Sequence, residues 1–98
     1  MNIVTEAIAG TVESNDIIIK IEPTENDGIE INLTSNVMQQ FGEQIEKVIR
    51  ETLSELGVKK ARIEATDKGA LDCTIKARTA AAVYRAAQST DYEWRARA

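Results

Sequence analysis

The first third of the chain alternates apolar and polar residues in three short segments. Side chains at every second position share one face of a β-strand, so this alternation predicts half-buried strands. The predicted strands are residues 8–13, 16–22 and 29–34. Only Ser14 and Asn15 lie between the first two, and we expect them to form the tip of a tight hairpin, because asparagine tolerates the positive φ of such turns. The stretch "PTENDG" at 23–28 predicts a second turn and completes a three-stranded meander.

A helical periodicity follows the third strand. Asn36, with Gln39 three residues later, matches a capping box at the start of a helix. Gly57 matches the left-handed residue that commonly ends one. We therefore predict a long helix over residues 38–56. Its apolar face is formed by residues at three- and four-residue spacing, namely Met38, Phe41, Ile45, Val48, Ile49, Leu53 and Leu56.

Two further strands and a second helix are predicted in the rest of the chain. Alternation over residues 61–66 and 71–76, separated by the turn word "DKG", predicts another hairpin. A last helix is predicted over residues 78–88. Residues 89–98 lack periodicity, and we expect a flexible tail there, beyond a single domain of residues 1–88. The small residues expected to pack the last helix closely on the sheet are Ala80, Ala81 and Ala87, together with Tyr84.

The predicted order along the chain is β-β-β-α-β-β-α, which defines an α+β fold. Part of this order follows the split βαβ pattern. We expect a two-layer sandwich with one mainly antiparallel five-stranded sheet, in the order 1-2-3-5-4, and both helices on one face. The Ser14 tip is expected at one end of an edge hairpin, away from the core.

Composition limits the classes of function. A chain of 98 residues, 43% hydrophobic and 29% charged, suits one modest core and a globular protein. The net charge of −4 argues against a nucleic-acid partner, because such binding depends on lysine and arginine neutralising phosphates. No apolar run is long enough to span a membrane. The single cysteine permits no internal disulfide and the N-terminus shows no signal-peptide pattern, so we expect a cytoplasmic protein.

The sequence contains no histidine. That removes serine–histidine and cysteine–histidine nucleophile pairs, histidine-based metal sites and the usual general base near neutral pH. Nothing resembles a calcium-binding loop either, so no metal is expected. Cys73 alternates in phase with Leu71 and Ile75, which predicts core packing for its thiol rather than an acyl-bearing role. If the protein takes part in catalysis, we expect its partners to perform the proton transfers.

Charged and aromatic side chains offer weaker candidates. Glu13, Asp16 and Asp27 form either an acidic rim for a partner or a set of solvated turn residues, and the second interpretation is favoured. The arginines near the C-terminus are expected to be solvated, with contact to an acidic partner as the alternative; they are Arg78, Arg85, Arg95 and Arg97. No basic patch interleaves the aromatic residues of this region, so no base-stacking platform is predicted from Tyr84, Tyr92 and Trp94.

Ser14 admits two interpretations from the residues alone. Turns need polar residues, so an ordinary Ser-Asn turn is the simpler one. Alternatively, a hydroxyl held at a hairpin tip is accessible to a modifying enzyme, and a long group attached there moves freely.

Several long sequence words, taken together, resemble a known family. "AIAGTVESNDIIIKIEP", "NDGIEI", "FGEQI" and "DKGALDCTIKAR" are similar to words in the acyl carrier protein, or gamma subunit, of citrate lyase, and the resemblance covers residues 8–87. It implies that the serine of "GTVES", Ser14, carries 2'-(5''-phosphoribosyl)-3'-dephospho-CoA through a phosphodiester. Family members often have a second serine next to it, where this chain has Asn15.

The resemblance also implies a role and partners. The arm's thiol bears an acetyl group, which the alpha subunit, an acyl transferase, exchanges for citryl. The beta subunit, a citryl lyase, then cleaves the citryl thioester to oxaloacetate and restores the acetyl form. A separate transferase attaches the arm. The chain itself is expected to be a non-catalytic carrier.

Two alternatives remain open at this point. The carrier of malonate decarboxylase uses the same arm, although "DKGALDC" and "FGEQI" favour the citrate lyase carrier. From a different class, the chain is an α+β interaction module without any modification.

Overall fold

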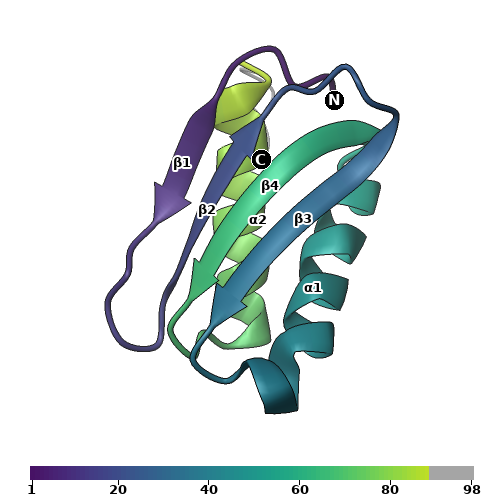
Figure 1. The fold of residues 1–98 in the computed structure, drawn as a ribbon. Coiled ribbons are helices and arrows are strands. Elements are labelled where there is room, and N and C mark those ends of the chain that lie inside the picture. Colours follow the sequence, from purple (N-terminus) through teal and green to yellow (C-terminus); the bar gives the residue numbers. More distant parts are fainter. Residues whose placement is uncertain (89–98) are drawn as a thin grey trace.

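The two central strands of the sheet contribute most of its buried residues. The computed structural model describes residues 1–88, with β1 (Ala7–Gly10), β2 (Ile17–Glu22), β3 (Gly28–Ser35), α1 (Met38–Glu55), β4 (Lys60–Asp67) and α2 (Asp72–Ala86) (Figure 1). The strands lie in the order β1-β2-β4-β3. Alternate residues of β2 and β4 are buried on one face and form the middle of the core: Ile17, Ile19, Ile21, Ala61, Ile63 and Ala65.

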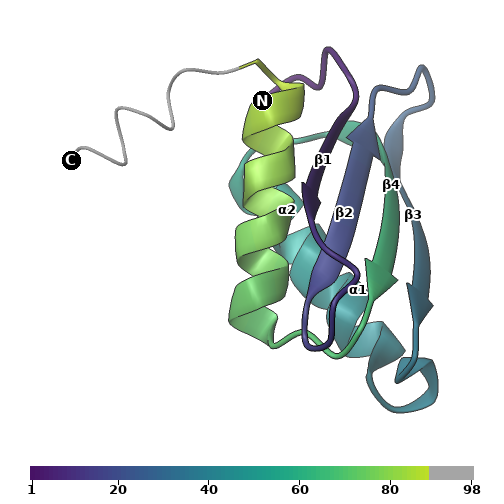
Figure 2. The same cartoon turned by 90° about the vertical axis from the view of Figure 1, so that its left-hand side faces the viewer.

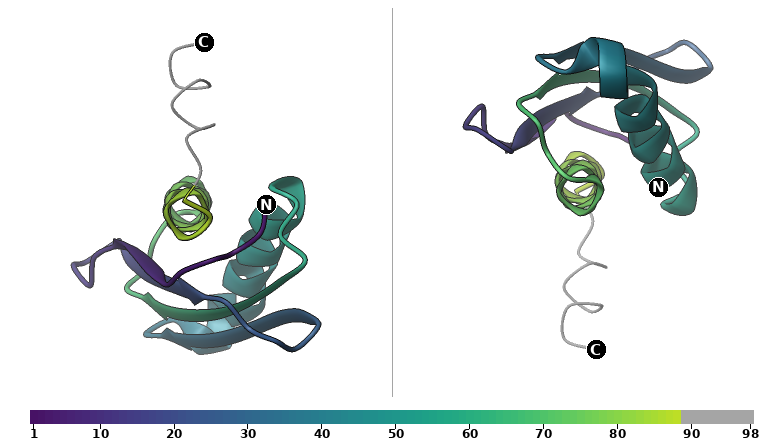
Figure 3. Two further views of the ribbon diagram at one scale, coloured as in Figure 1. Left: turned by 90° about the horizontal axis from the view of Figure 1, so that it is seen from above. Right: turned by 90° about the horizontal axis from the view of Figure 1, so that it is seen from below.

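Both helices cover the same face of this sheet, which gives a two-layer α+β sandwich (Figure 2). Viewed along the strands, α1 and α2 lie side by side over that face (Figure 3). They bury Ile45, Ile49 and Leu53 from α1, and Ile75 and Val83 from α2. The expected class and the placement of both helices are therefore observed.

The number of strands was predicted wrongly, because residues 71–76 do not form a strand. Residues 1–88 form four strands, and α2 already begins at Asp72. Leu71 and Cys73 are exposed, so the short alternation with Ile75 does not describe a buried face. The buried residues of α2 instead follow a helical spacing that starts at Ile75: Ile75, Thr79, Ala82, Val83 and Ala86. This buried face differs from the one predicted from the sequence for the last helix.

The predicted strand order 1-2-3-5-4 was also wrong. β2 pairs with β4 in antiparallel fashion, and β3 pairs with β4 in parallel, so β4 separates β2 from β3 and the sheet is mixed rather than mainly antiparallel. β3 exposes every second residue and leaves Ile29, Ile31 and Leu33 only half-buried, as suits an edge strand. β4 buries four of its eight residues, which suits the centre. The β3-α1-β4 unit is an unsplit βαβ unit.

The long helix was predicted correctly in place and extent, but its first turn differs from the prediction. Asn36 is not the N-cap: the structure places Val37 there without a side-chain cap, and the backbone N–H of Val37 donates to Oγ of Ser35 at 3.1 Å. Met38 and Phe41 are exposed rather than packed in the core. Gly57 has φ +71°, as predicted for the residue that ends the helix.

The predicted tail, residues 89–98, lies outside the described residues, together with Tyr92, Trp94, Arg95 and Arg97. Within residues 1–88, no helix combines the length and the apolar character that crossing a membrane requires.

Candidate functional site

Ser14 is exposed in the connection between β1 and β2, at the edge of the sheet. This connection, residues 11–16, is longer than the two-residue tip predicted from the sequence, because β1 ends at Gly10. Gly10 has φ +98°, and a Cβ on it would collide with the carbonyl oxygen of Ile17. Only glycine accommodates both conditions, so the glycine of "GTVES" sets where the strand stops and the Ser14 loop (residues 11–16) begins.

Within the Ser14 loop, Ser14 and Asn15 are the central residues of a turn, as predicted. The backbone N–H of Asp16 donates to the carbonyl oxygen of Glu13 at 3.2 Å, which closes the turn. Asn15 takes the positive φ expected of it, +66°. Oγ1 of Thr11 accepts the backbone N–H of Glu13 at 3.2 Å. The side chain of Ser14 is thereby presented at the apex of a turn that its neighbours define.

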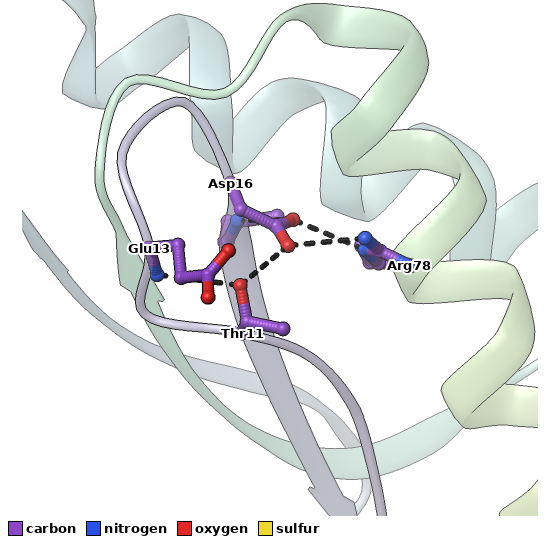
Figure 4. Close-up of polar contacts among 5 residues, drawn as sticks. Thr11, Glu13, Asp16 and Arg78 are labelled. Carbon is purple, nitrogen blue, oxygen red and sulfur yellow. Dashed lines mark hydrogen bonds and ion pairs between the residues drawn. The ribbon is translucent and has the colours of Figure 1, made fainter.

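Asp16 anchors this turn to the second helix (Figure 4). Its two carboxylate oxygens accept hydrogen bonds from Nε and a terminal nitrogen of Arg78, each at 3.0 Å. Thr11 Oγ1 donates to Oδ2 of Asp16 at 2.7 Å, and the backbone N–H of Ile17 donates to Oδ1 at 2.7 Å. The side chain of Asp16 is only 13% exposed. The prediction of a solvated turn residue was therefore wrong for Asp16, whereas Glu13 and Asp27 are exposed.

The contacts between Asp16 and Arg78 favour the charged form of both side chains. Hydrogen bonds from Arg78 and then from Thr11 hold the pKa of Asp16 well below its ordinary value of 3.8. The same pairing raises the pKa of Arg78. Asp16 is thus a weak base at neutral pH, and its carboxylate is already occupied. Its role in the loop is structural.

A second set of contacts ties the loop to the connection between β4 and α2. The backbone N–H of Asn15 donates to the carbonyl oxygen of Lys68 at 2.8 Å, and the N–H of Lys68 donates to the carbonyl oxygen of Asp16 at 2.9 Å. The adjoining Asp67 is 1% exposed and accepts hydrogen bonds from the N–H groups of Gly69 and Ala70. It also accepts a hydrogen bond from the hydroxyl of Ser35 at 2.8 Å. The Ser14 loop is therefore hydrogen-bonded to a connection that Asp67 itself holds in place.

An apolar groove opens on the other side of that connection. It has a volume of about 610 Å³ and lies between the first turns of α1 and α2. Cys73 lines it and is exposed, so the prediction that its thiol packs in the core was wrong. Nε2 of Gln44 donates to Oδ2 of Asp72 across the rim at 2.9 Å. The other lining residues include Val37, Phe41, Gly69 and Leu71.

The remaining candidates do not assemble into a second site. Arg85 donates to the carbonyl oxygen of Ile8 at 2.7 Å, and Tyr84 is half-buried. Among residues 1–88, the histidine-, cysteine- and carboxylate-type ligands form no group of three that suits a metal ion.

Two contacts that shape the Ser14 loop and its neighbour were not found from the sequence. Arg78 was interpreted as solvated, and its partner Asp16 lies 62 positions away along the chain, so no local pattern links them. Asp67 carries a local signal, because an aspartate that opens the turn word "DKG" is typical of a side chain that accepts the N–H groups of the following residues.

Comparisons with known proteins define the class of this molecule. Residues 4–86 match the family described as "Malonate decarboxylase delta subunit (MdcD)", an acyl carrier family. One chain in the crystal structure of a Pseudomonas malonate decarboxylase hetero-tetramer in complex with malonate has a similar fold, with a TM-score of 0.67 over 83% of this chain and 82% of that one. Its sequence identity is 18%, so this likeness concerns the fold alone.

Curated relatives narrow the family. The citrate lyase acyl carrier protein of Streptococcus mutans is 57% identical over 95 residues, which is 97% of this chain and 93% of the relative. That of Escherichia fergusonii is 50% identical over 94 residues, 96% of this chain and 97% of the relative. The chain therefore belongs to the family of citrate lyase acyl carrier proteins. These relatives are named as carriers and not as catalytic subunits, which confirms the prediction of a non-catalytic carrier.

Proposed function

We propose that this protein is the acyl carrier subunit of citrate lyase and carries acetyl and citryl groups on 2'-(5''-phosphoribosyl)-3'-dephospho-CoA attached through Ser14. The observation that carries the proposal is the 50–57% identity, over nearly the full chain, with proteins named as citrate lyase acyl carriers. The exposed hydroxyl of Ser14 supports the choice of attachment site. When bound, the group supplies a terminal thiol that forms thioesters.

The geometry of the Ser14 loop fits a phosphodiester link. An exposed hydroxyl at the apex of a turn leaves room for the attached phosphate and for the enzyme that adds it. Ser14 has no histidine to activate it, and the Asp16 carboxylate beside it is held by Arg78 and Thr11. We therefore expect the transferase to supply the general base for attachment.

The contribution of this chain to citrate cleavage is delivery. A group held by a short flexible link meets a neighbouring active site at an effective concentration in the ~mM range. The alpha subunit, an acyl transferase, and the beta subunit, a citryl lyase, would supply the chemistry within one cytoplasmic hetero-oligomer. The chain holds this loop through Asp16, which pairs with Arg78, and through the backbone N–H of Asn15, which bonds to Lys68, while the side chain of Ser14 stays exposed.

Substitution of Ser14 tests the attachment site. Complexes assembled with Ser14→Ala should lack the arm and show no citrate cleavage above background, while the circular dichroism spectrum stays unchanged because Ser14 is exposed. Ser54→Ala is the matched control, since Ser54 is an exposed serine on α1. Full citrate cleavage by the Ser14→Ala complex would refute the assignment.

The family description favours one alternative, the carrier of malonate decarboxylase. The substrate that the assembled complex cleaves distinguishes the two carriers. Release of acetate and oxaloacetate from citrate supports the citrate lyase carrier, and release of carbon dioxide from malonate supports the alternative. The much higher identity to citrate lyase carriers makes the first result the expected one.

A further inference from the structure

The groove between α1 and α2 leaves large apolar side chains uncovered. Phe41 is 53% exposed at one wall and Leu71 is 69% exposed at the other. Large apolar side chains that gather around a hollow are typical of a binding site, whereas single exposed ones are not. Within residues 1–88, no segment of the chain covers these side chains.

The groove lies at the same end of the molecule as the Ser14 loop. Figure 1 places the loop, the connection from β4 to α2 and the start of α1 together at that end. Asn15 donates its backbone N–H to Lys68, and a Cβ built on the groove residue Gly69 would lie 3.6 Å from Oδ1 of Asn15. One turn therefore bears Ser14 and also touches the edge of the groove.

The size of the groove favours a small molecule over a protein. Its volume of about 610 Å³ falls in the range of small-molecule sites, ~300–1,000 Å³. Nine residues line it, whereas a stable protein interface uses about 20–30 residues on each side. The lining is apolar apart from Gln44 and Asp72, which already bond to each other at the rim. That chemistry suits an uncharged chain with methyl and amide groups.

A coenzyme A arm has two chemically different ends. Its phosphates carry the charge, and its acetyl-pantetheine end is uncharged and partly apolar, whereas a citryl group would add two carboxylates. We propose that the groove is a resting site for the acetyl-pantetheine end of the arm on Ser14, with Phe41 and Leu71 among its lining residues. This inference rests on the proposed function. Because the arm is tethered at ~mM effective concentration, a groove with an intrinsic dissociation constant of only ~0.1 mM holds about 90% of the arms.

Cys73 reports on the groove directly, since its exposed thiol lines it. The experiment compares the acetyl-loaded carrier, whose arm thiol is blocked, with unmodified carrier made without the transferase. Intact mass first establishes that Ser14 is modified. Both forms are then treated with N-ethylmaleimide, and alkylation of Cys73 is followed by mass spectrometry. The loaded carrier should react about tenfold more slowly, as expected for ~90% occupancy.

Two variants make the comparison specific. In Cys73→Ser combined with Ala77→Cys, the thiol sits on α2 at an exposed position outside the groove, so loaded and unmodified forms should react equally. Phe41→Gln removes one apolar wall without opening the core, because Phe41 is already 53% exposed. It should restore fast alkylation of Cys73 in the loaded carrier.

Three outcomes decide between the alternatives. A modified carrier whose Cys73 reacts as fast as in the unmodified form overturns the resting site and leaves the proposed function intact. Protection that appears only on adding the other subunits, and equally for unmodified carrier, overturns it in favour of a subunit interface. Absence of any arm on carrier purified with its complex overturns both the proposed function and this inference.

Discussion

Two polar loops flank β2, and they differ in how they are held. The Ser14 loop is anchored at long range, by Asp16 to Arg78 on α2 and by Asn15 to Lys68. The loop at 23–27 has the same turn-forming composition, but its side-chain hydrogen bond is local, from the N–H of Asn26 to Oγ1 of Thr24 at 3.2 Å. In the sequence both loops read as ordinary turns.

The difference between the loops bears on the carrier role. A loop that only joins two strands needs no contact beyond them. If Ser14 is modified as we propose, a loop that presents its hydroxyl to the modifying enzyme benefits from a fixed position. The anchored loop is the one that holds Ser14, and its anchors leave the apex exposed.

The largest expected effect comes from glycines in matched positions. Gly10 and Gly28 both have positive φ, +98° and +94°, at the edges of the two loops. A Cβ on Gly10 would strike the backbone of Ile17, whereas a Cβ on Gly28 meets nothing within 4 Å. Gly10→Ala should therefore lower the free energy of unfolding by about 3 kcal/mol or more, and Gly28→Ala by about 1 kcal/mol, in urea denaturation. Equal losses would contradict the strand-ending role of Gly10.

The next effect comes from aspartates beside the two loops. Asp67 is buried and accepts three hydrogen bonds. Asp67→Ala strands those donors and should cost about 2–3 kcal/mol of unfolding free energy. Asp27→Ala, at an exposed position in the loop at 23–27, should change stability by less than about 0.5 kcal/mol. Thermal unfolding of both variants beside the parent checks the contrast, and a harmless Asp67→Ala would count against it.

A smaller, local effect is expected at the ion pair. Arg78→Gln removes the bidentate pairing with Asp16, so the amide of Asn15 should exchange its hydrogen severalfold faster while the core amides of β2 are unaffected. Arg62→Gln is the matched control, because it breaks an exposed pair with Glu30 on the other side of the sheet. Unchanged exchange at Asn15 in the Arg78→Gln variant would show that the anchor is dispensable.

The smallest effect is that of pH. The folded-state pKa of Asp16 lies below the ordinary 3.8, so the pairing contributes stability above that value and loses it only as pH falls through the lower folded pKa. The carboxyl carbon resonance of Asp16 should therefore stay constant from pH 8 to about 4. A titration midpoint at or above 3.8 would contradict the pairing.

Strong local patterns made β2 and α1 predictable. Three isoleucines at alternate positions are buried as expected, and the helix that follows β3 ends at Glu55, just before Gly57 with its positive φ. The alternation of Leu71 and Ile75 is too short to distinguish a strand from a helix, and it was wrongly interpreted as a strand. The insertion of β4 between β2 and β3 depends on the pairing of segments far apart in the sequence, which no single segment reveals.

The site was predictable only in part for a similar reason. Asn15 and the turn around Ser14 follow from local backbone preferences, and they were found. The pairing of Asp16 with Arg78 and the groove beside Cys73 arise from the packing of α2. Placing residues 71–76 in a strand instead of in this helix therefore hid both features.

The central claim is that Ser14 holds the prosthetic arm, and intact mass with peptide mapping tests it most directly. The carrier is purified with its own transferase and both partner subunits, so that modification can occur. The carrier should have a mass above that of the unmodified chain by the full arm, with the addition on the peptide that contains Ser14. Carrier from the same preparation at the unmodified mass, or modified on another peptide, would contradict it.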